Sequence, residues 1–105
     1  MRRRYIAVRI DSDRTSEERD IYDAVWTSIL RLFGEYGASQ TELTLVDYDQ
    51  ETKQAILRCS HKALSLVEAS IVAVTEMDNE KATIHIVLVS GTLRSLRRKI
   101  SRSTV

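Results

Sequence analysis

The residues that could carry out catalytic chemistry are few and lie far apart in this sequence. Cys59 is the single cysteine, which excludes an internal disulfide, and His61 and His85 lack the spacing of metal ligands. A nucleophilic Cys59 would need a base and an electropositive setting. We predict instead that Cys59 is a small buried apolar residue at the end of a strand, and we expect no structural zinc site.

Acidic residues form two groups that could hold magnesium, Glu17 with Glu18 and the run from Asp47 to Glu51. A solvated helix start and a hairpin turn are the simpler interpretations. Acylphosphatase-like hydrolysis would need a glycine-rich loop around phosphate and an amide to orient water. The three glycines are dispersed and the one asparagine, Asn79, falls in a predicted turn. The sequence therefore offers no metal site and no catalytic set that we would propose.

Positive charge is concentrated at the two ends of the chain, although the formal net charge is only +1. Residues 1–9 carry four arginines and no acid, and residues 93–105 carry four arginines and a lysine with no acid. Residues 10–51 have eleven acidic residues against three arginines, a net charge of −8. The protein is thus a dipole, and its ends favour contact with phosphates.

Two segments combine positive charge with a suitable local structure. The junction at 58–62 places cations where a helix is predicted to begin, which costs a few tenths of a kcal/mol unless an anion binds there. This junction is either a phosphate-binding site or ordinary surface charge, and the sequence leaves both interpretations open. Residues 92–100 predict an amphipathic helix that docks through Leu93, Leu96 and Ile100 and turns its arginines outward. A solvated tail and a membrane-surface helix are alternatives, the latter weak because the apolar face is small.

The elements that must position these residues follow from apolar periodicity. Residues 5–10 alternate as a half-buried strand, and a helix is expected from Ser16 to Tyr36, stopped by Gly37 in a left-handed conformation. A hairpin joins strands at 43–48 and 53–59. Ser60 then caps a second helix extending to Met77, and a strand at 82–89 precedes the basic helix.

This order predicts one α/β (α+β) domain over residues 1–105, with basic and flexible ends at 1–3 and 101–105. The plan is the ferredoxin-like βαββαβ sandwich, in which two helices cover one face of a four-stranded antiparallel sheet, plus a short basic C-terminal helix. No apolar stretch approaches the length of a membrane span and no signal-peptide core follows Met1. We therefore expect a cytoplasmic protein that contacts no membrane.

The sheet and the second helix suggest different partners. RNA-recognition modules stack bases on sheet aromatics, but here only Tyr5 stands in a central strand, and a covering role for it is the better interpretation. The second helix carries apolar residues around most of its circumference, so a partner protein or the C-terminal helix should cover it. The residues that we assign to partner binding are Leu66, Ala69, Val72 and Ala73.

Four blocks of the sequence resemble a known family. They are Arg2–Ile6, Leu32–Ala38, Arg58–Lys62 and Val89–Lys99, and in this order they resemble the archaeal ribonuclease P protein component 2 family over nearly the whole chain. The resemblance and the charge together assign RNA binding to a set of polar residues. These are Arg2, Arg3, Arg4, Arg58, Ser60, His61, Lys62, Arg94, Arg97, Arg98 and Lys99.

The resemblance implies a protein subunit of the ribonucleoprotein endonuclease that removes the 5′ leader of precursor tRNA. It implies that the RNA subunit and its magnesium ions perform the hydrolysis, while the protein binds no cofactor and contacts precursor tRNA indirectly. It also implies pairing with ribonuclease P protein component 3 in a two-plus-two assembly on ribonuclease P RNA. The alternative is a ferredoxin-like regulatory or oligomerisation domain that binds protein or small molecules through its sheet.

Overall fold

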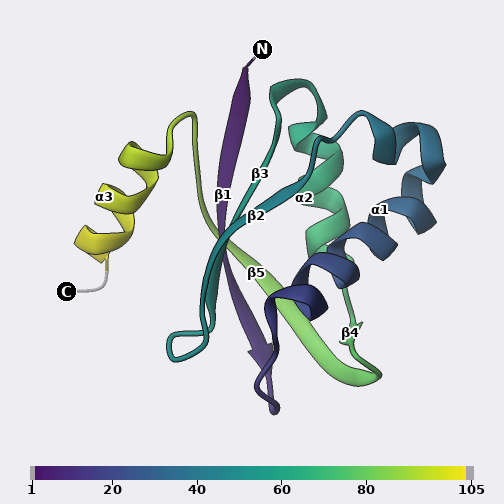
Figure 1. The fold of residues 1–105 in the computed structure, drawn as a ribbon, viewed down its shortest axis with the longest axis horizontal. Helices are drawn as coiled ribbons and strands as arrows, with labels where there is room; N and C mark the ends of the chain where they lie inside the picture. The colour runs from purple at the N-terminus through teal and green to yellow at the C-terminus, as the bar shows by residue number, and fades with distance from the viewer. Residues whose placement is uncertain (1, 104–105) are drawn as a thin grey trace.

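A computed structural model describes residues 2–103; Met1 and residues 104–105 lie outside the described part. Its elements are β1 (Arg3–Ser12), α1 (Glu18–Ser39), β2 (Thr44–Asp49), β3 (Gln54–Ser60), the 3-10 turn η1 (His61–Ala63), α2 (Leu64–Val72), β4 (Glu76–Met77), β5 (Glu80–Ser90) and α3 (Leu93–Ser103) (Figure 1). The predicted order of strands and helices is present. The ends of several elements differ from the prediction, for reasons given below.

The sheet has the strand order β2-β3-β1-β5-β4, and neighbouring strands are antiparallel. The predicted count of four strands was wrong, because β4 adds a short fifth strand beside β5. Asp78 and Asn79 have φ values of 51° and 64°, the left-handed pair that closes a two-residue hairpin between these strands. The chain needs residues 74–77 for that hairpin, so α2 ends at Val72 and not at Met77 as predicted.

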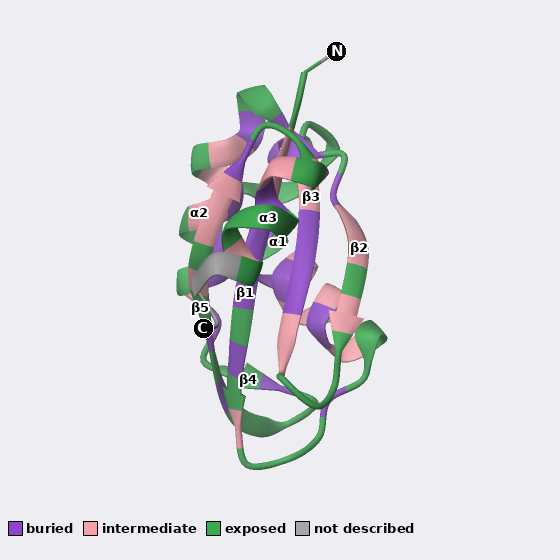
Figure 2. Cartoon of the chain, turned by 90° about the vertical axis from the view of Figure 1, so that its left-hand side faces the viewer, coloured by how far each residue is buried: buried purple, intermediate pink, exposed green. Residues whose placement is uncertain are grey.

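The two faces of the sheet carry separate apolar cores. Ile6, Val8 and Leu57 belong to the larger core, which α1 and α2 cover. The strand neighbours Ala7 and Ile56 point to the opposite face, where they pack with Leu96 of α3. Figure 1 shows α3 on one side of the sheet and α1 and α2 on the other, and Figure 2 shows α3 lying across β1 and β3. The C-terminal helix is therefore part of the fold.

The glycine that interrupts α1 is not the one predicted. Gly37 is buried and helical, and a Cβ there would lie 2.7 Å from the Cβ of Phe33, so close packing excludes a side chain. The left-handed residue is Gly34, with φ 73° and ψ −177°, and it kinks the helix. The helix continues to Ser39. Glycine is required at both positions, for space at Gly37 and for backbone conformation at Gly34.

The predicted helix cap at Ser16 was wrong, and Ser60, which stands at the N-cap position of η1, makes no capping hydrogen bond with its side chain. Helix α1 begins after Glu17, whose backbone N–H donates to the Asp20 carboxylate over 3.0 Å, forming one half of a capping box. The Ser60 hydroxyl donates to the carbonyl of Gln40 over 2.8 Å and so ties the end of β3 to the segment after α1. The chain passes from Ser60 through η1 before α2 starts.

Candidate nucleic-acid interface

Antiparallel pairing brings the four sequence blocks to one end of the sheet. Strand β1 begins where β3 and β5 end, so Arg3 lies opposite Ser60 and Tyr5 lies opposite Ser90. The segment that follows α1 joins them, because the Ser60 N–H donates to the carbonyl of Thr41 over 2.8 Å. We call this region the basic end. In Figure 1 it is the end at which the N-terminus lies.

Arg4 holds three of these segments together. Its Nε donates to Nδ1 of His61 over 2.9 Å, and a Cβ at Gly91 would lie 2.8 Å from its Nη1. The backbone N–H of His61 also donates to the carbonyl of Arg2 over 3.0 Å. Because Nδ1 of His61 accepts a hydrogen bond, its Nε2 is the ring nitrogen that can donate to a ligand. Half-buried Arg4 thus positions His61, while Arg2 and Arg3 are exposed.

A hollow of about 640 Å³ opens beside this linkage. Its lining is rich in side chains that can hold an anion, with one opposing carboxylate: Arg2, Ser39, Gln40, Glu42, Ser60, His61 and Lys62. The sequence assigned Arg2, Ser60, His61 and Lys62 to RNA binding, and the structure brings these four together. The sequence prediction missed Ser39, Gln40 and Glu42, which lie at the end of α1 or just after it and reach the hollow only through the tertiary fold.

Arg58 lies apart from this hollow. It is paired with Tyr5 and Thr44 across neighbouring strands, and its Nη2 is 3.5 Å from the Thr44 hydroxyl on the sheet face that α3 shares. Strand alternation turns Cys59 the opposite way, into the larger core. Tyr5 is half-buried in the core beneath α3, which confirms the covering role predicted for it.

Helix α3 carries the second group of predicted RNA-binding residues. The Thr92 hydroxyl accepts the Ser95 N–H over 3.1 Å and caps the helix, and Leu96 is fully buried against the sheet. Arg94, Arg97, Arg98 and Lys99 are all exposed. Arg97 makes an ion pair of 3.3 Å with Asp47 of β2, the only one of these four to pair with an acid within residues 2–103.

The groups considered for catalysis have structural roles. Cys59 is fully buried, and burial together with the nearby Glu68 carboxylate raises the pKa of its thiol to about 11. It is therefore a core thiol, as predicted, and stays protonated at neutral pH. The Asp47 and Asp49 carboxylates accept the backbone N–H groups of Tyr48 and Glu51, each over 2.9 Å, as turn residues do. Among the described residues no cluster of His, Cys, Asp or Glu has the makeup of a metal site.

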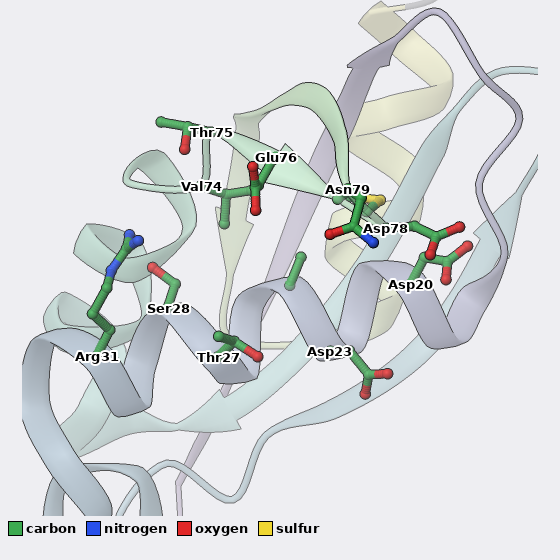
Figure 3. A pocket seen from close by; sticks show the side chains of 12 residues that line it. Asp20, Asp23, Thr27, Ser28, Arg31, Val74, Thr75, Glu76, Asp78 and Asn79 are labelled. Atoms are coloured by element: carbon green, nitrogen blue, oxygen red, sulfur yellow. The ribbon is translucent and has the colours of Figure 1, made fainter.

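The opposite end of the molecule is acidic. A hollow of about 280 Å³ lies between α1 and the β4–β5 turn, and Asp20, Asp23, Glu76 and Asp78 are among its lining residues (Figure 3). Strand β1 leads away from the basic end, so the acidic segment that follows it starts at the far end. The charge asymmetry seen along the sequence is thus also an asymmetry in space, which would orient the protein toward a polyanion.

The predicted partner-binding residues divide into two pairs. Leu66 and Ala73 are half-buried beside α1, where Leu66 packs near Gly37 and the Ala73 carbonyl lies 3.5 Å from Nη2 of Arg31. Ala69 and Val72 are exposed, Val72 to 62%. The second pair is the more exposed of the two. No described helix is long and apolar enough to cross a bilayer.

The fold and its charged end define a small α+β domain of the kind that binds polyanions. The model of the Rpp14/Pop5 family matches residues 4–101, so the chain belongs to the Rpp14/Pop5 family. The resemblance found in the four sequence blocks is confirmed, and with it the expectation of a ribonuclease P protein subunit.

Relatives and a solved structure agree with this placement. Ribonuclease P protein component 2 of Pyrococcus furiosus is 33% identical over 98 residues, which cover 93% of this chain and 82% of the relative. The protein of the same name from Methanocaldococcus jannaschii is 31% identical over 98 residues, covering 93% and 72%. A chain in the cryo-EM structure of yeast ribonuclease MRP has the same fold, with a TM-score of 0.75 at 16% identity over 98% of this chain and 91% of that one.

Proposed function

We propose that this protein is a non-catalytic RNA-binding subunit of ribonuclease P that assists removal of the 5′ leader from precursor tRNA. The RNA subunit and its magnesium ions carry out the hydrolysis, and the protein holds no cofactor of its own. The protein contacts ribonuclease P RNA directly and precursor tRNA only indirectly, in the cytoplasm. Family membership supports the assembly with RNA and other protein subunits.

The observation that best supports RNA binding is that basic residues from separate segments lie together at one end of the fold. Arg2, His61 and Lys62 line one hollow there, and α3 begins three residues after the strand position opposite Tyr5. Nucleic acid binding needs several cations at phosphate spacing on a continuous surface. The exposed cations of α3 supply further phosphate contacts on the sheet face that α3 covers.

The alternative, a domain that binds ligands through its sheet, is less well supported. Helix α3 occupies much of the sheet face that is free of α1 and α2, and Leu96 is fully buried beneath it. We classify the fold as a ferredoxin-like sandwich extended by β4. A hollow of about 350 Å³ remains beside α3, near the lower limit for a small-molecule site, and charged Asp47, Asp49 and Arg97 lie in its lining next to Ala7 and Ile56.

Reconstitution tests the function directly. Ribonuclease P RNA and precursor tRNA are incubated with and without the purified protein over a range of magnesium concentrations, and 5′ leader release is measured. We expect the protein alone to cleave nothing and its addition to the RNA to lower the magnesium requirement or raise the rate. Cleavage by RNA-free protein that disappears in the Asp47→Asn or Asp49→Asn variant would contradict the proposal.

We further propose that the exposed side of α2 binds ribonuclease P protein component 3, in an assembly of two copies of each. Val72 is the largest apolar side chain exposed there, so Val72→Asp should weaken co-purification with component 3 and leave the helical circular dichroism unchanged. The matched control is Val87→Asp on β5, which is 40% exposed on another surface. Equal losses in both variants, or none in Val72→Asp, would exclude this side of α2.

A further inference from the structure

The end of α1 presents aromatic rings beside the basic hollow. Tyr36 is 80% exposed and Phe33 is 43% exposed, in a chain whose other large apolar residues are mostly buried. They line a second hollow, of about 340 Å³, together with Gln40, Lys62 and Leu66. An exposed tyrosine ring on a helix contributes little to folding, and here it forms an aromatic patch with Phe33 beside Lys62, which suits a binding site.

The backbone of α1 is built to hold these rings in place. Gly34 lies between Phe33 and Tyr36 with the left-handed φ of 73°, which turns the last part of the helix. At Gly37 the missing side chain leaves room for Phe33 and for Cδ1 of Leu66, which would lie 2.7 and 3.4 Å from a Cβ. The Ser39 hydroxyl donates to the Tyr36 carbonyl over 2.6 Å and fixes the final turn. Two glycines thus set the ring positions.

The aromatic hollow and the basic hollow adjoin each other, because Gln40 and Lys62 line both. A ligand that fills both must be flat and apolar at one end and anionic at the other. An unpaired nucleotide has this form, with a base that stacks on an aromatic ring and a phosphate that a lysine or histidine can hold. Toward the basic end the neighbours of the rings are Lys62, His61 and Arg2, and three cationic or hydrogen-bond-donating side chains together favour an anionic ligand.

We propose that Tyr36 is a stacking platform for an unpaired RNA base whose phosphate is held at Lys62 and His61. This inference rests on the proposed RNA-binding function and adds that the basic end selects single-stranded over double-stranded RNA. Phe33 supports the stacked base from the preceding turn. The Gln40 amide, which both donates and accepts, lies within the same site and can reach a base edge.

The test measures binding of the full-length protein to a labelled single-stranded oligoribonucleotide and to an RNA duplex of equal length. Fluorescence anisotropy is recorded at several salt concentrations for wild type, Tyr36→Ala, Tyr36→Phe and Lys62→Gln, with circular dichroism to verify folding. We expect Tyr36→Ala to lose about tenfold or more in affinity for the single strand with an unchanged salt slope. Tyr36→Phe should bind as wild type does, because the ring remains.

The duplex and the lysine variant separate this inference from the function on which it rests. Tyr36→Ala should leave duplex affinity unchanged, and Lys62→Gln should flatten the single-strand salt slope by about 0.7. If Tyr36→Ala binds the single strand as wild type does, while Lys62→Gln still flattens the slope, the stacking site is wrong and RNA binding stands. If wild type binds neither RNA, the proposed function fails as well. Unchanged RNA binding with loss of a protein partner in Tyr36→Ala would make the rings a protein contact.

Discussion

The ion pair between Arg97 and Asp47 predicts that removal of one acid will strengthen RNA binding specifically. Nη2 of Arg97 lies 3.3 Å from Oδ2 of Asp47, and both side chains are about half exposed, at 53% and 52%. A pair this exposed contributes about 0.2–1 kcal/mol to stability. Asp47→Asn should therefore lower the melting temperature by only a few degrees, while it frees Arg97 for a phosphate.

The size of the effect follows from counterion release. Each added phosphate contact steepens the plot of log affinity against log salt by about 0.9 for a duplex and about 0.7 for a single strand. Asp47→Asn should steepen the slope by up to that amount and raise affinity at low salt, as measured with ribonuclease P RNA. Asp49→Asn is the matched control, because it removes the same charge from the same strand. The Asp49 carboxylate accepts the backbone N–H of Glu51 and makes no ion pair with Arg97 among the described residues.

The double variant Asp47→Asn with Arg97→Gln completes the cycle. If Arg97 reaches a phosphate once it is free, the double variant should lose the added slope and return to the wild-type value or below it. Arg98→Gln, in which the changed side chain is exposed beside the pair, should flatten the slope in the wild-type background. Equal changes in Asp47→Asn and Asp49→Asn would refute the reasoning, since the effect would then come from net charge alone.

Three further predictions concern the fold. Leu96→Ala should lower the free energy of unfolding in urea by about 2–5 kcal/mol, because Leu96 is the fully buried side chain that docks this short helix. The backbone amides of α3 should then exchange hydrogen faster. An unchanged exchange rate would mean that other contacts hold α3 in place. Gly34→Ala should lower the free energy of unfolding, measured in the same way, by about 1–3 kcal/mol, since the φ of 73° and ψ of −177° at this position suit glycine. An unchanged free energy of unfolding would show that this backbone conformation is not required. Burial and then the Glu68 carboxylate raise the pKa of Cys59 to about 11, so the folded state keeps a proton that the unfolded state releases near pH 9. Stability should thus fall as pH rises from about 9 to 11, and Cys59→Ala should remove this component of the decline.

Local patterns were sufficient to predict the elements whose packing is set by their own periodicity. Alternation placed Ile6 and Val8 on one side of β1, and the spacing of Leu93, Leu96 and Ile100 indicated the docking side of α3. In each case the buried residues belong to one element and repeat at its own period. The exposed arginines of α3 followed from the same reasoning.

Local patterns failed where a distant segment decides the conformation. Gly34 and Gly37 are equally good as helix stops in the sequence, and only the closeness of Phe33 and Leu66 to Gly37 assigns their roles. Serine is a residue type that often caps helices, but the Ser60 hydroxyl donates to the carbonyl of Gln40, twenty residues earlier in the chain. Such choices depend on tertiary contacts that no window of neighbouring residues contains.

The candidate site shows the same division between local and distant information. Separately, each of the four blocks is an ordinary feature: a basic strand start, a helix end, a strand end and a helix cap. The strand order places the start of β1 between the ends of β3 and β5, and Arg4 then reaches both His61 and Gly91. Basic residues from two distant parts of the chain, Arg2 with Arg4 and His61 with Lys62, thereby meet on one surface at the basic end. Because α1 runs back from the acidic end to the same place, it delivers Tyr36 to that surface, which the charge pattern alone gave no reason to expect.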